Sequence, residues 1–396
     1  MDSLRNLYKI GNGPSSSHTM GPQIASQRFK DKNPNATKYS VELFGSLALT
    51  GKGHLTDYII KKTLGDNKTE VLFNLDQVYS YHTNAMKFRA YINDDLLDEW
   101  LVFSVGGGAL KELNEPRDTG TIDIYPHKSM KEILTYCEEE KIDLVTYVQR
   151  FDQGIYEYLE KIYHSMQETI KRGLAADGVL PGRLQVKRRS KSFYQAYLNS
   201  PNKSFPKLLF SYALATAEEN ASAGVIVTSP TCGSSGVLPA ILFVAKDYHH
   251  HKKDTIIKAL MVAGLIGNII KFNGSISGAE VGCQGEIGVA CAMASAAEAF
   301  LLKGTNKQIE YAAEIALEHH LGLTCDPVDG VVQIPCIERN AIASAKAFDA
   351  ANYALLTDGD HYISLDDVVK VMMETGLDLH SKYKETSTGG LASNKK

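Results

Sequence analysis

The stretch GAEVGCQGEIGVAC, residues 278–291, surrounds Cys283 with glycine and other small residues. Two later stretches, LTCDPVDG and QIPCIERN, place Cys325 and Cys336 beside turn-forming residues in a similar way. Glycine and proline allow a backbone to bend sharply and to come close to a bulky group. We therefore expect the three sulfurs to belong to one site, around which the rest of the chain is organised.

Length and composition indicate a globular protein of one large or two smaller domains. The chain has 396 residues, of which 44% are hydrophobic and 22% charged, so it can bury a core. A net charge of −4 predicts neither a nucleic-acid partner nor an anionic membrane partner. We find no run of about 18 apolar residues and no signal peptide, and expect no membrane span. Six cysteines are too few for a disulfide scaffold, which favours the reducing cytoplasm.

The apolar pattern changes along the chain and predicts two kinds of architecture. Residues 39–44 alternate as a β-strand does, and further strands are expected at 88–91 and 100–105. Beyond residue 128 the apolar positions follow helical periodicity. We predict an α+β protein with a small mixed α/β domain at 1–127 and a larger all-helical domain at 128–396. Helices are expected at residues 128–141, 144–173, 255–270 (buried on all sides), 291–302, 308–319 and 341–355.

A hydroxyl-rich loop is expected at residues 10–22, IGNGPSSSHTMGP, because its glycines and prolines exclude a regular helix or a central strand. Its N–H and O–H groups suit an anionic group such as a carboxylate. An ordinary serine-rich loop without a ligand fits the same composition. The candidate binding residues are Ser15, Ser16, Ser17, His18 and Thr19.

His54 is the candidate general base. It follows the glycine-framed sequence GKG, and Asp57 lies three residues further on. A carboxylate close to a histidine can orient the ring for proton transfer. A structural histidine is the alternative that the sequence leaves open.

The spacing of the three cysteines decides which metal chemistry they suit. No two of them are two to four residues apart, as the paired ligands of structural zinc sites usually are. Three thiolates from separate loops suit an iron–sulfur cluster in which one iron lacks a protein ligand and can act as a Lewis acid. From the spacing alone, buried and inert thiols, which are common among free cysteines, stay open as the alternative.

Six motifs run through the chain in the order GPSSSHTMGP, GSLALTGKGH, SPTCGSSGVLPA, NGSISGAEVGCQGEIGVAC, EHHLGLTCDPVDGVVQIPCIERNAIA and KYKETSTGGLA. In this order they resemble the iron–sulfur-dependent bacterial L-serine dehydratases, from Gly13 to Ala392. The resemblance implies the single-chain type, with a β domain before a helical, catalytic α domain. The β domain of the family is similar to the allosteric substrate-binding domain of some phosphoglycerate dehydrogenases.

The resemblance implies a lyase that converts L-serine to pyruvate and ammonia. It implies a [4Fe-4S] cluster held by Cys283, Cys325 and Cys336, with the open iron on the β-hydroxyl of L-serine and His54 as the base for the α-proton. Donors from the serine-rich loop and the NGSISG loop would hold the substrate carboxylate. In the second loop these donors are Asn273, Ser275 and Ser277.

Two features depart from the family pattern. Some relatives carry a cysteine at the extreme C-terminus, whereas this chain has none after Cys336, so no such thiolate can cap the open iron. The SPTCGSSG loop carries Cys232, where many relatives have another residue. We treat Cys137, Cys232 and Cys291 as cysteines that do not bind the cluster.

Other functions stay open from the sequence alone. One is a related cluster-dependent lyase that acts on threonine or cysteine, and another is a non-enzymatic protein that binds an amino acid or senses oxygen. A pyridoxal enzyme could perform the same elimination, but Lys271 is the only lysine in a suggestive setting. The leading hypothesis takes L-serine as the small-molecule partner of a cytoplasmic homodimer.

Overall fold

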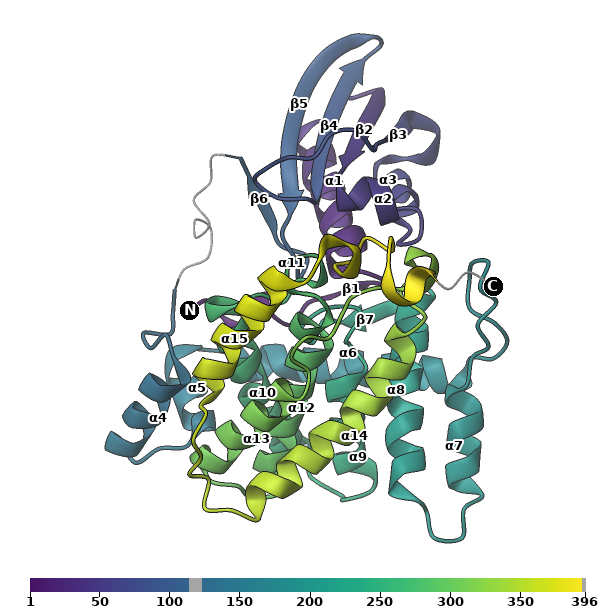
Figure 1. The fold of residues 1–396 in the computed structure, drawn as a ribbon. Helices are drawn as coiled ribbons and strands as arrows, with labels where there is room; N and C mark the ends of the chain where they lie inside the picture. Colours follow the sequence, from purple (N-terminus) through teal and green to yellow (C-terminus); the bar gives the residue numbers. More distant parts are fainter. Residues whose placement is uncertain (114–122, 394–396) are drawn as a thin grey trace.

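The computed structural model describes residues 1–113 and 123–393, and in it a small sheet domain sits on one end of a larger helical body (Figure 1). The five-stranded sheet has the order β3-β2-β4-β5-β6. Strand β2 pairs with β3 in parallel, and the other neighbours are antiparallel. The predicted α+β class is confirmed. The strands are β2 Lys38–Phe44, β3 Thr69–Asn74, β4 Ala85–Ile92, β5 Asp95–Ser104 and β6 Leu110–Glu112.

Two helices close the core of the sheet domain. Phe29 of α1 (Gly21–Lys32) packs on Phe88 of the sheet with 5.4 Å between ring centroids. Helix α3 (Thr56–Leu64) buries its own apolar side chains in the same cluster. Because β2 and α3 are both fixed by this core, the segment that joins them, residues 45–55, is held in place at the junction with the helical body.

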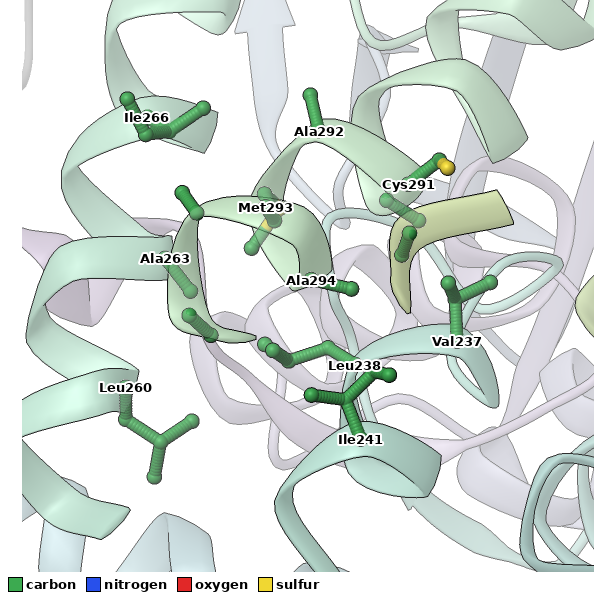
Figure 2. Close-up of a cluster of buried hydrophobic side chains, with 14 of the residues drawn as sticks. Val237, Leu238, Ile241, Leu260, Ala263, Ile266, Cys291, Ala292, Met293 and Ala294 are labelled. Carbon is green, nitrogen blue, oxygen red and sulfur yellow. The ribbon is translucent and has the colours of Figure 1, made fainter. Parts of the chain in front are cut away.

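The helical body is built around α10 and α12, whose many small side chains allow neighbouring helices to approach closely. Ala263 of α10, Met293 of α12 and Leu238 of α9 belong to one buried cluster (Figure 2). The loops that carry the cysteines leave this rigid base. The helices are α4 Met130–Glu139, α5 Leu144–Phe151, α6 Ile155–Ala175, α7 Ser190–Leu198, α8 Phe205–Ala221, α9 Val237–Asp247, α10 Lys253–Asn273, α11 Gly278–Val281, α12 Ile287–Leu301, α13 Asn306–Glu318, α14 Cys336–Leu355 and α15 Leu365–Asp378.

The prediction of a single helix at residues 144–173 is wrong, because the structure has two separate helices there, α5 and α6. Asp152 lies between the two helices, and its carboxylate accepts hydrogen bonds from the Leu4 N–H (3.0 Å) and the Ser3 hydroxyl (2.8 Å). The break between the two helices thus combines this contact with the distant N-terminus and Gly154, whose φ of 68° lies in the left-handed region. The other expected strands and helices are confirmed, with ends shifted by a few residues.

Helix α10 is buried on nearly all sides, as predicted. By length and composition it is also apolar enough to cross a membrane, which a search for uninterrupted apolar runs misses because Lys258 and Asn268 interrupt the sequence. In the structure 78% of its apolar window is buried inside the helical body. We interpret α10 as a core helix.

The N-terminal segment belongs spatially to the helical body. Met1, Leu4 and Tyr8 are fully buried among its helices, and the Tyr8 hydroxyl donates a hydrogen bond to the Leu260 carbonyl (3.0 Å). The strand that follows, β1 (Ile10–Asn12), pairs with β7 (Val225–Val227). The division into domains at residues 1–127 and 128–396 stays a prediction. The first residues of the chain lie before this boundary but pack within the helical body.

The C-terminal segment returns from α15 to the junction of the two parts (Figure 1). The Cys325 N–H donates to the Tyr383 carbonyl and the Glu385 N–H donates to the Cys325 carbonyl, both at 2.7 Å. The Leu391 N–H donates to the Asp326 carboxylate at the same distance. These bonds hold the last described residues against the loop that carries Cys325.

Candidate active site

Cys283, Cys325 and Cys336 line one cavity between the sheet domain and the helical body. Cys283 lies in the short turn before α12, and its N–H donates to the Leu323 carbonyl (2.9 Å), which ties the first loop to the second. Cys325 is held by the C-terminal segment, and Cys336 begins α14. The three sulfurs therefore come together through loop contacts between segments far apart in sequence.

The remaining cysteines do not line the cavity, although Cys232 directly precedes Gly233, which does. Cys137 is buried in α4, Cys232 packs with Ile226, and the Cys291 thiol donates to the Ala343 carbonyl (3.2 Å). None of the three is among the residues that line the cavity. Their placement supports the prediction that they do not bind the cluster.

A glycine in the motif makes room for the thiols. A Cβ atom added to Gly278 would lie 2.7 Å from a carboxylate oxygen of Glu286 and 3.1 Å from the Cys325 sulfur. The first distance is shorter than real Cβ contacts and the second is tighter than most of them, so a larger residue at this position would push the two groups away. The small residues of the GAEVGCQG stretch thus allow a backbone to pass directly beside the site.

The electrostatic environment favours one thiolate in particular. The pKa of Cys283 is lowered to about 6, because the Cys325 thiol hydrogen-bonds to it and the Arg339 cation lies close by. The same hydrogen bond raises the pKa of Cys325, and burial raises that of Cys336. Arg339 is anchored by donating to the Thr324 carbonyl (2.7 Å). A fixed cation beside three thiols is suited to a group that the thiols bind as anions.

Two carboxylates complete the lining, and neither was predicted. The Glu286 carboxylate accepts a hydrogen bond from the Thr231 hydroxyl (2.7 Å) and lies 3.9 Å from the Cys325 sulfur. The ligand atoms of Cys283, Glu286 and Cys325 all lie within 4.8 Å of one another. Glu385 comes from the C-terminal segment and is 6% exposed. Glu286 lies in the motif GCQGEIG, close to Cys283, and Glu385 lies in the C-terminal motif KYKETSTGG. These positions were the signal in the sequence that could have identified the two residues.

Burial also shifts the pKa values of these carboxyl groups. Burial raises the pKa of Glu385 to about 8, with a further contribution from the negative charge of Cys283. Burial and the charge of Glu385 raise the pKa of Glu286 well above its usual value. A cation brought into the cavity would therefore stabilise the ionised form of each carboxyl group.

His54 lines the cavity from the sheet-domain side. Its Nδ1 lies 3.0 Å from the Thr50 carbonyl oxygen, and its buried Nε2 has no hydrogen-bond partner within the described part of the chain. Burial lowers the pKa of the ring to about 4. The orienting group is thus the Thr50 carbonyl rather than Asp57, which had been expected for this purpose. The result is a neutral ring with an unpaired nitrogen beside the thiols.

His18 lies next to His54, with 4.5 Å between the ring centroids. Its Nδ1 is 2.8 Å from the Ser17 hydroxyl and its Nε2 is 3.0 Å from the Ser46 hydroxyl. Burial and the neighbouring His54 lower its pKa well below the usual value. Both ring nitrogens of His18 are therefore already engaged.

The rest of the serine-rich loop supports this arrangement. Ser15 is the one predicted hydroxyl of the loop that lines the cavity. Its side chain accepts a hydrogen bond from the His18 N–H (3.1 Å), and the Thr19 hydroxyl donates to the His54 carbonyl (2.7 Å). Ser16 is buried at the start of the turn formed by Ser16–Met20. Most of these residues hold the histidines in place.

The NGSISG loop lies behind the site. Asn273 ends α10 and donates to the Lys128 carbonyl (2.7 Å), and the Ser275 hydroxyl donates to the Glu280 carboxylate (2.6 Å). The Ser277 N–H donates to the Ser275 hydroxyl (3.1 Å). None of the three predicted residues is among those that line the cavity. Their hydrogen bonds shape the turn that leads to Gly278.

The cavity is narrow, with a volume of about 20 Å³. Its walls come from the sheet domain (Ser15 and His54), the helical body (the three cysteines and Glu286) and the C-terminal segment (Glu385). By this measure of volume one water molecule needs about 10–15 Å³, so the cavity has room for about one. A larger ligand can enter only if one of these walls moves.

Comparison with known proteins gives matches along nearly the whole chain. The family model "Serine dehydratase beta chain" matches residues 3–69, and "Serine dehydratase alpha chain" matches residues 75–392. L-serine dehydratase 1 of Escherichia coli (strain K12) is 39% identical, and the alignment covers 99% of both chains. The L-serine dehydratase of Helicobacter pylori is 38% identical over 98% of both chains.

Proposed function

Since the chain belongs to the serine dehydratase family, we propose that it is an enzyme that converts L-serine to pyruvate and ammonia. The family and the names of the relatives support the substrate and the reaction. The observation that carries the proposal is the buried, unpaired Nε2 of His54 in a cavity lined by three thiols. His54 can act as a base, and the three thiols can bind a metal in the same cavity.

We further propose that Cys283, Cys325 and Cys336 hold a [4Fe-4S] cluster. The donor set supports this, because three thiols of one cavity come from three loops and the Arg339 cation lies beside them. The partly buried carboxylate of Glu286 lies next to two of the sulfurs. When bound, such a cluster supplies an iron without a protein ligand, which can act as a Lewis acid toward a hydroxyl group.

His54 is proposed to remove the α-proton of L-serine through Nε2. The Thr50 carbonyl accepts the hydrogen of Nδ1, so Nε2 keeps its lone pair, and the low pKa keeps the ring neutral at ordinary pH. Loss of this proton and of the β-hydroxyl, released as water, gives 2-aminoacrylate. That product becomes an imine, which water hydrolyses to pyruvate and ammonia.

The substrate carboxylate is assigned to the serine-rich loop. Ser15 is the proposed direct donor, because it lines the cavity. Ser16, Ser17, His18 and Thr19 are proposed to act with it by holding the loop and the two rings. Asn273, Ser275 and Ser277 are proposed to act indirectly, through the turn that positions Gly278. Each hydrogen bond to the carboxylate favours a single orientation of the substrate.

The test is an anaerobic assay of the purified protein with L-serine, L-threonine and L-cysteine, with iron and sulfide measured in the same sample. We expect the rate of pyruvate formation from L-serine to be proportional to the cluster content. Exposure to air should remove the cluster and the activity, since an iron without a protein ligand is open to oxidants. Reconstitution with iron, sulfide and reductant should restore part of the activity. No pyruvate from L-serine at full cluster content would reject the proposal.

A further inference from the structure

The proposed function leaves one group of the substrate without a partner, and the inference below rests on that function. L-serine brings a carboxylate, a β-hydroxyl, an α-hydrogen and an ammonium group into a buried cavity. Ser15, the cluster and His54 account for the first three. A cation placed in such a cavity is costly unless an anion lies beside it.

Two carboxylates of the described residues line the cavity, and their surroundings differ. Glu286 already accepts a hydrogen bond from Thr231 and lies against the Cys325 sulfur, on the side of the thiols. Glu385 faces the histidines instead. Its Oε1 lies 3.7 Å from Nδ1 of His18 and 3.9 Å from Nε2 of His54. Both distances exceed a hydrogen bond, so neither ring engages this oxygen, and the hydrogen bond that the carboxylate does accept comes from the backbone of Ala279.

The separation between Glu385 and His54 matches the geometry of an amino acid. The ammonium nitrogen and the α-hydrogen are attached to the same carbon, with an N–Cα bond of about 1.46 Å. A nitrogen that donates to an oxygen lies about 2.7–3.2 Å from it. The acceptor of the ammonium and the acceptor of the α-proton must therefore be only a few ångströms apart, and the measured distance is 3.9 Å.

We propose that the Glu385 carboxylate binds the ammonium group of the substrate and that the site is therefore selective for α-amino acids over hydroxy acids of the same size. Binding at Glu385 would place the α-carbon beside Nε2 of His54. The cation would in turn favour the ionised form of this buried carboxylate.

The backbone at Glu385 supports such a role. Its N–H is bonded to the Cys325 carbonyl (2.7 Å), and its φ of 57° lies in the left-handed region, which residues other than glycine adopt where their surroundings hold them. The carboxylate is thus fixed relative to a proposed cluster ligand. The ammonium site and the metal site would move together when the C-terminal segment moves.

The test uses Glu385→Gln, which keeps the size of the side chain and removes its charge, in the cluster-loaded full chain. The affinity for L-serine is measured against that for 3-hydroxypropanoate, which is L-serine without its ammonium group. We expect the KM for L-serine to rise about 10- to 100-fold, which is the usual range for a lost hydrogen bond to a charged group. Inhibition by 3-hydroxypropanoate and the iron and sulfide content should stay close to wild type.

Glu286→Gln is the matched comparison, since it removes the other carboxylate of the same cavity. A selective loss of L-serine binding in Glu286→Gln, with none in Glu385→Gln, would overturn the proposal. Glu385→Asp keeps the charge and should fall between wild type and Glu385→Gln, which provides a second test if the glutamine variant folds poorly. Turnover of L-serine by the wild type is tested separately, so failure of the proposed function is distinguishable from failure of this assignment.

Discussion

At the scale of single residues, the two adjacent histidines differ in what their ring nitrogens contact. His54 donates from Nδ1 to a backbone carbonyl and leaves Nε2 unpaired, whereas both nitrogens of His18 lie beside hydroxyl groups. A ring whose nitrogens are both engaged must break a hydrogen bond before it can take a proton. The local hydrogen bonds, and not the residue type, therefore assign the two rings to different roles.

His54→Ala should lower turnover by about two to four decades, the usual contribution of a positioned acid–base group. Cluster content should persist, because no proposed cluster ligand is changed. His18→Ala should mainly weaken binding of L-serine. The measurements are anaerobic turnover and exchange of the α-hydrogen of L-serine with solvent. Normal exchange in His54→Ala together with its loss in His18→Ala would reverse the two assignments.

Cys283→Ala, Cys325→Ala and Cys336→Ala should each lose the cluster and the activity, because each removes one of three proposed anchors. Iron and sulfide analysis of the anaerobically purified variants measures this. Cys137→Ala is the control, since Cys137 is buried in α4 and does not line the cavity. Full iron content and turnover in any of the first three variants would refute the assignment of that cysteine.

Burial of His54 should make stability depend on pH in a defined direction. Its pKa falls from 6.5 to about 4 on folding, so between these values the unfolded chain binds the extra proton. The contribution of His54 to the free energy of unfolding is fully present above pH 6.5. It is lost as the pH falls toward 4, at up to about 1.4 kcal/mol per pH unit. Urea unfolding at pH 7, 6 and 5 should show a weaker loss in His54→Ala than in wild type. His164→Ala, which changes an exposed histidine of α6, should follow wild type.

At the scale of elements, the C-terminal segment closes the site. It is tied to the Cys325 loop by backbone hydrogen bonds, and it supplies Glu385 to the cavity. Helix α12 supplies the opposite wall, because it starts directly after the turn that holds Cys283. The cavity thus lies between this buried helix, the C-terminal segment and the residues of the sheet domain, Ser15 and His54.

Gly390→Ala should loosen this segment without unfolding the protein. Gly390 has a φ of 62°, and a Cβ atom there would collide with the Asp326 carboxylate that binds the Leu391 N–H. We expect a cost of about 1–2 kcal/mol, seen as faster proteolysis of the C-terminus and lower activity. Gly182→Ala is the control, because it has the same kind of φ with no atom near the added Cβ. Equal protease sensitivity of the C-terminus in the two variants would contradict the proposed docking.

At the scale of the whole molecule, the far end of the helical body carries exposed aromatic side chains. Tyr362 is 98% exposed and Tyr353 is 58% exposed, and both line a surface hollow of about 560 Å³ between α13, α14 and residues 361–363. Exposed apolar groups that cluster in this way are typical of interaction sites. The homodimer expected from the sequence stays a prediction, and this surface is a place at which it can be tested.

Tyr353→Glu combined with Tyr362→Glu should convert a dimer into monomers, because two charges would face their own copies across a two-fold interface. Light scattering coupled to size-exclusion chromatography measures the mass directly. Leu75→Glu is the control, since Leu75 is also exposed but lies in the sheet domain. A monomeric wild type, or a double variant that stays dimeric, would exclude this surface as the dimer interface.

The fold could be predicted from the sequence to the extent that it follows from local patterns. The alternation at residues 39–44 and the helical periodicity beyond residue 128 gave the α+β class and most elements correctly. The predicted helix 144–173 failed at the break where Gly154 has a positive φ and where a distant segment binds Asp152. Such a contact between residues about 150 positions apart leaves no trace in local periodicity.

By itself the sequence determined the chemistry that is available: three cysteines in glycine-rich and proline-rich loops, a glycine-framed histidine and a hydroxyl-rich loop. Only the tertiary structure decided which of these groups meet. It brought Cys283, Cys325, Cys336, His54 and Ser15 to one cavity, left Asn273 at the end of α10, and added Glu286 and Glu385. The physical reason is that a site of this kind depends on distances between loops from separate segments. Packing of the helical core and the backbone hydrogen bonds of the C-terminal segment set those distances.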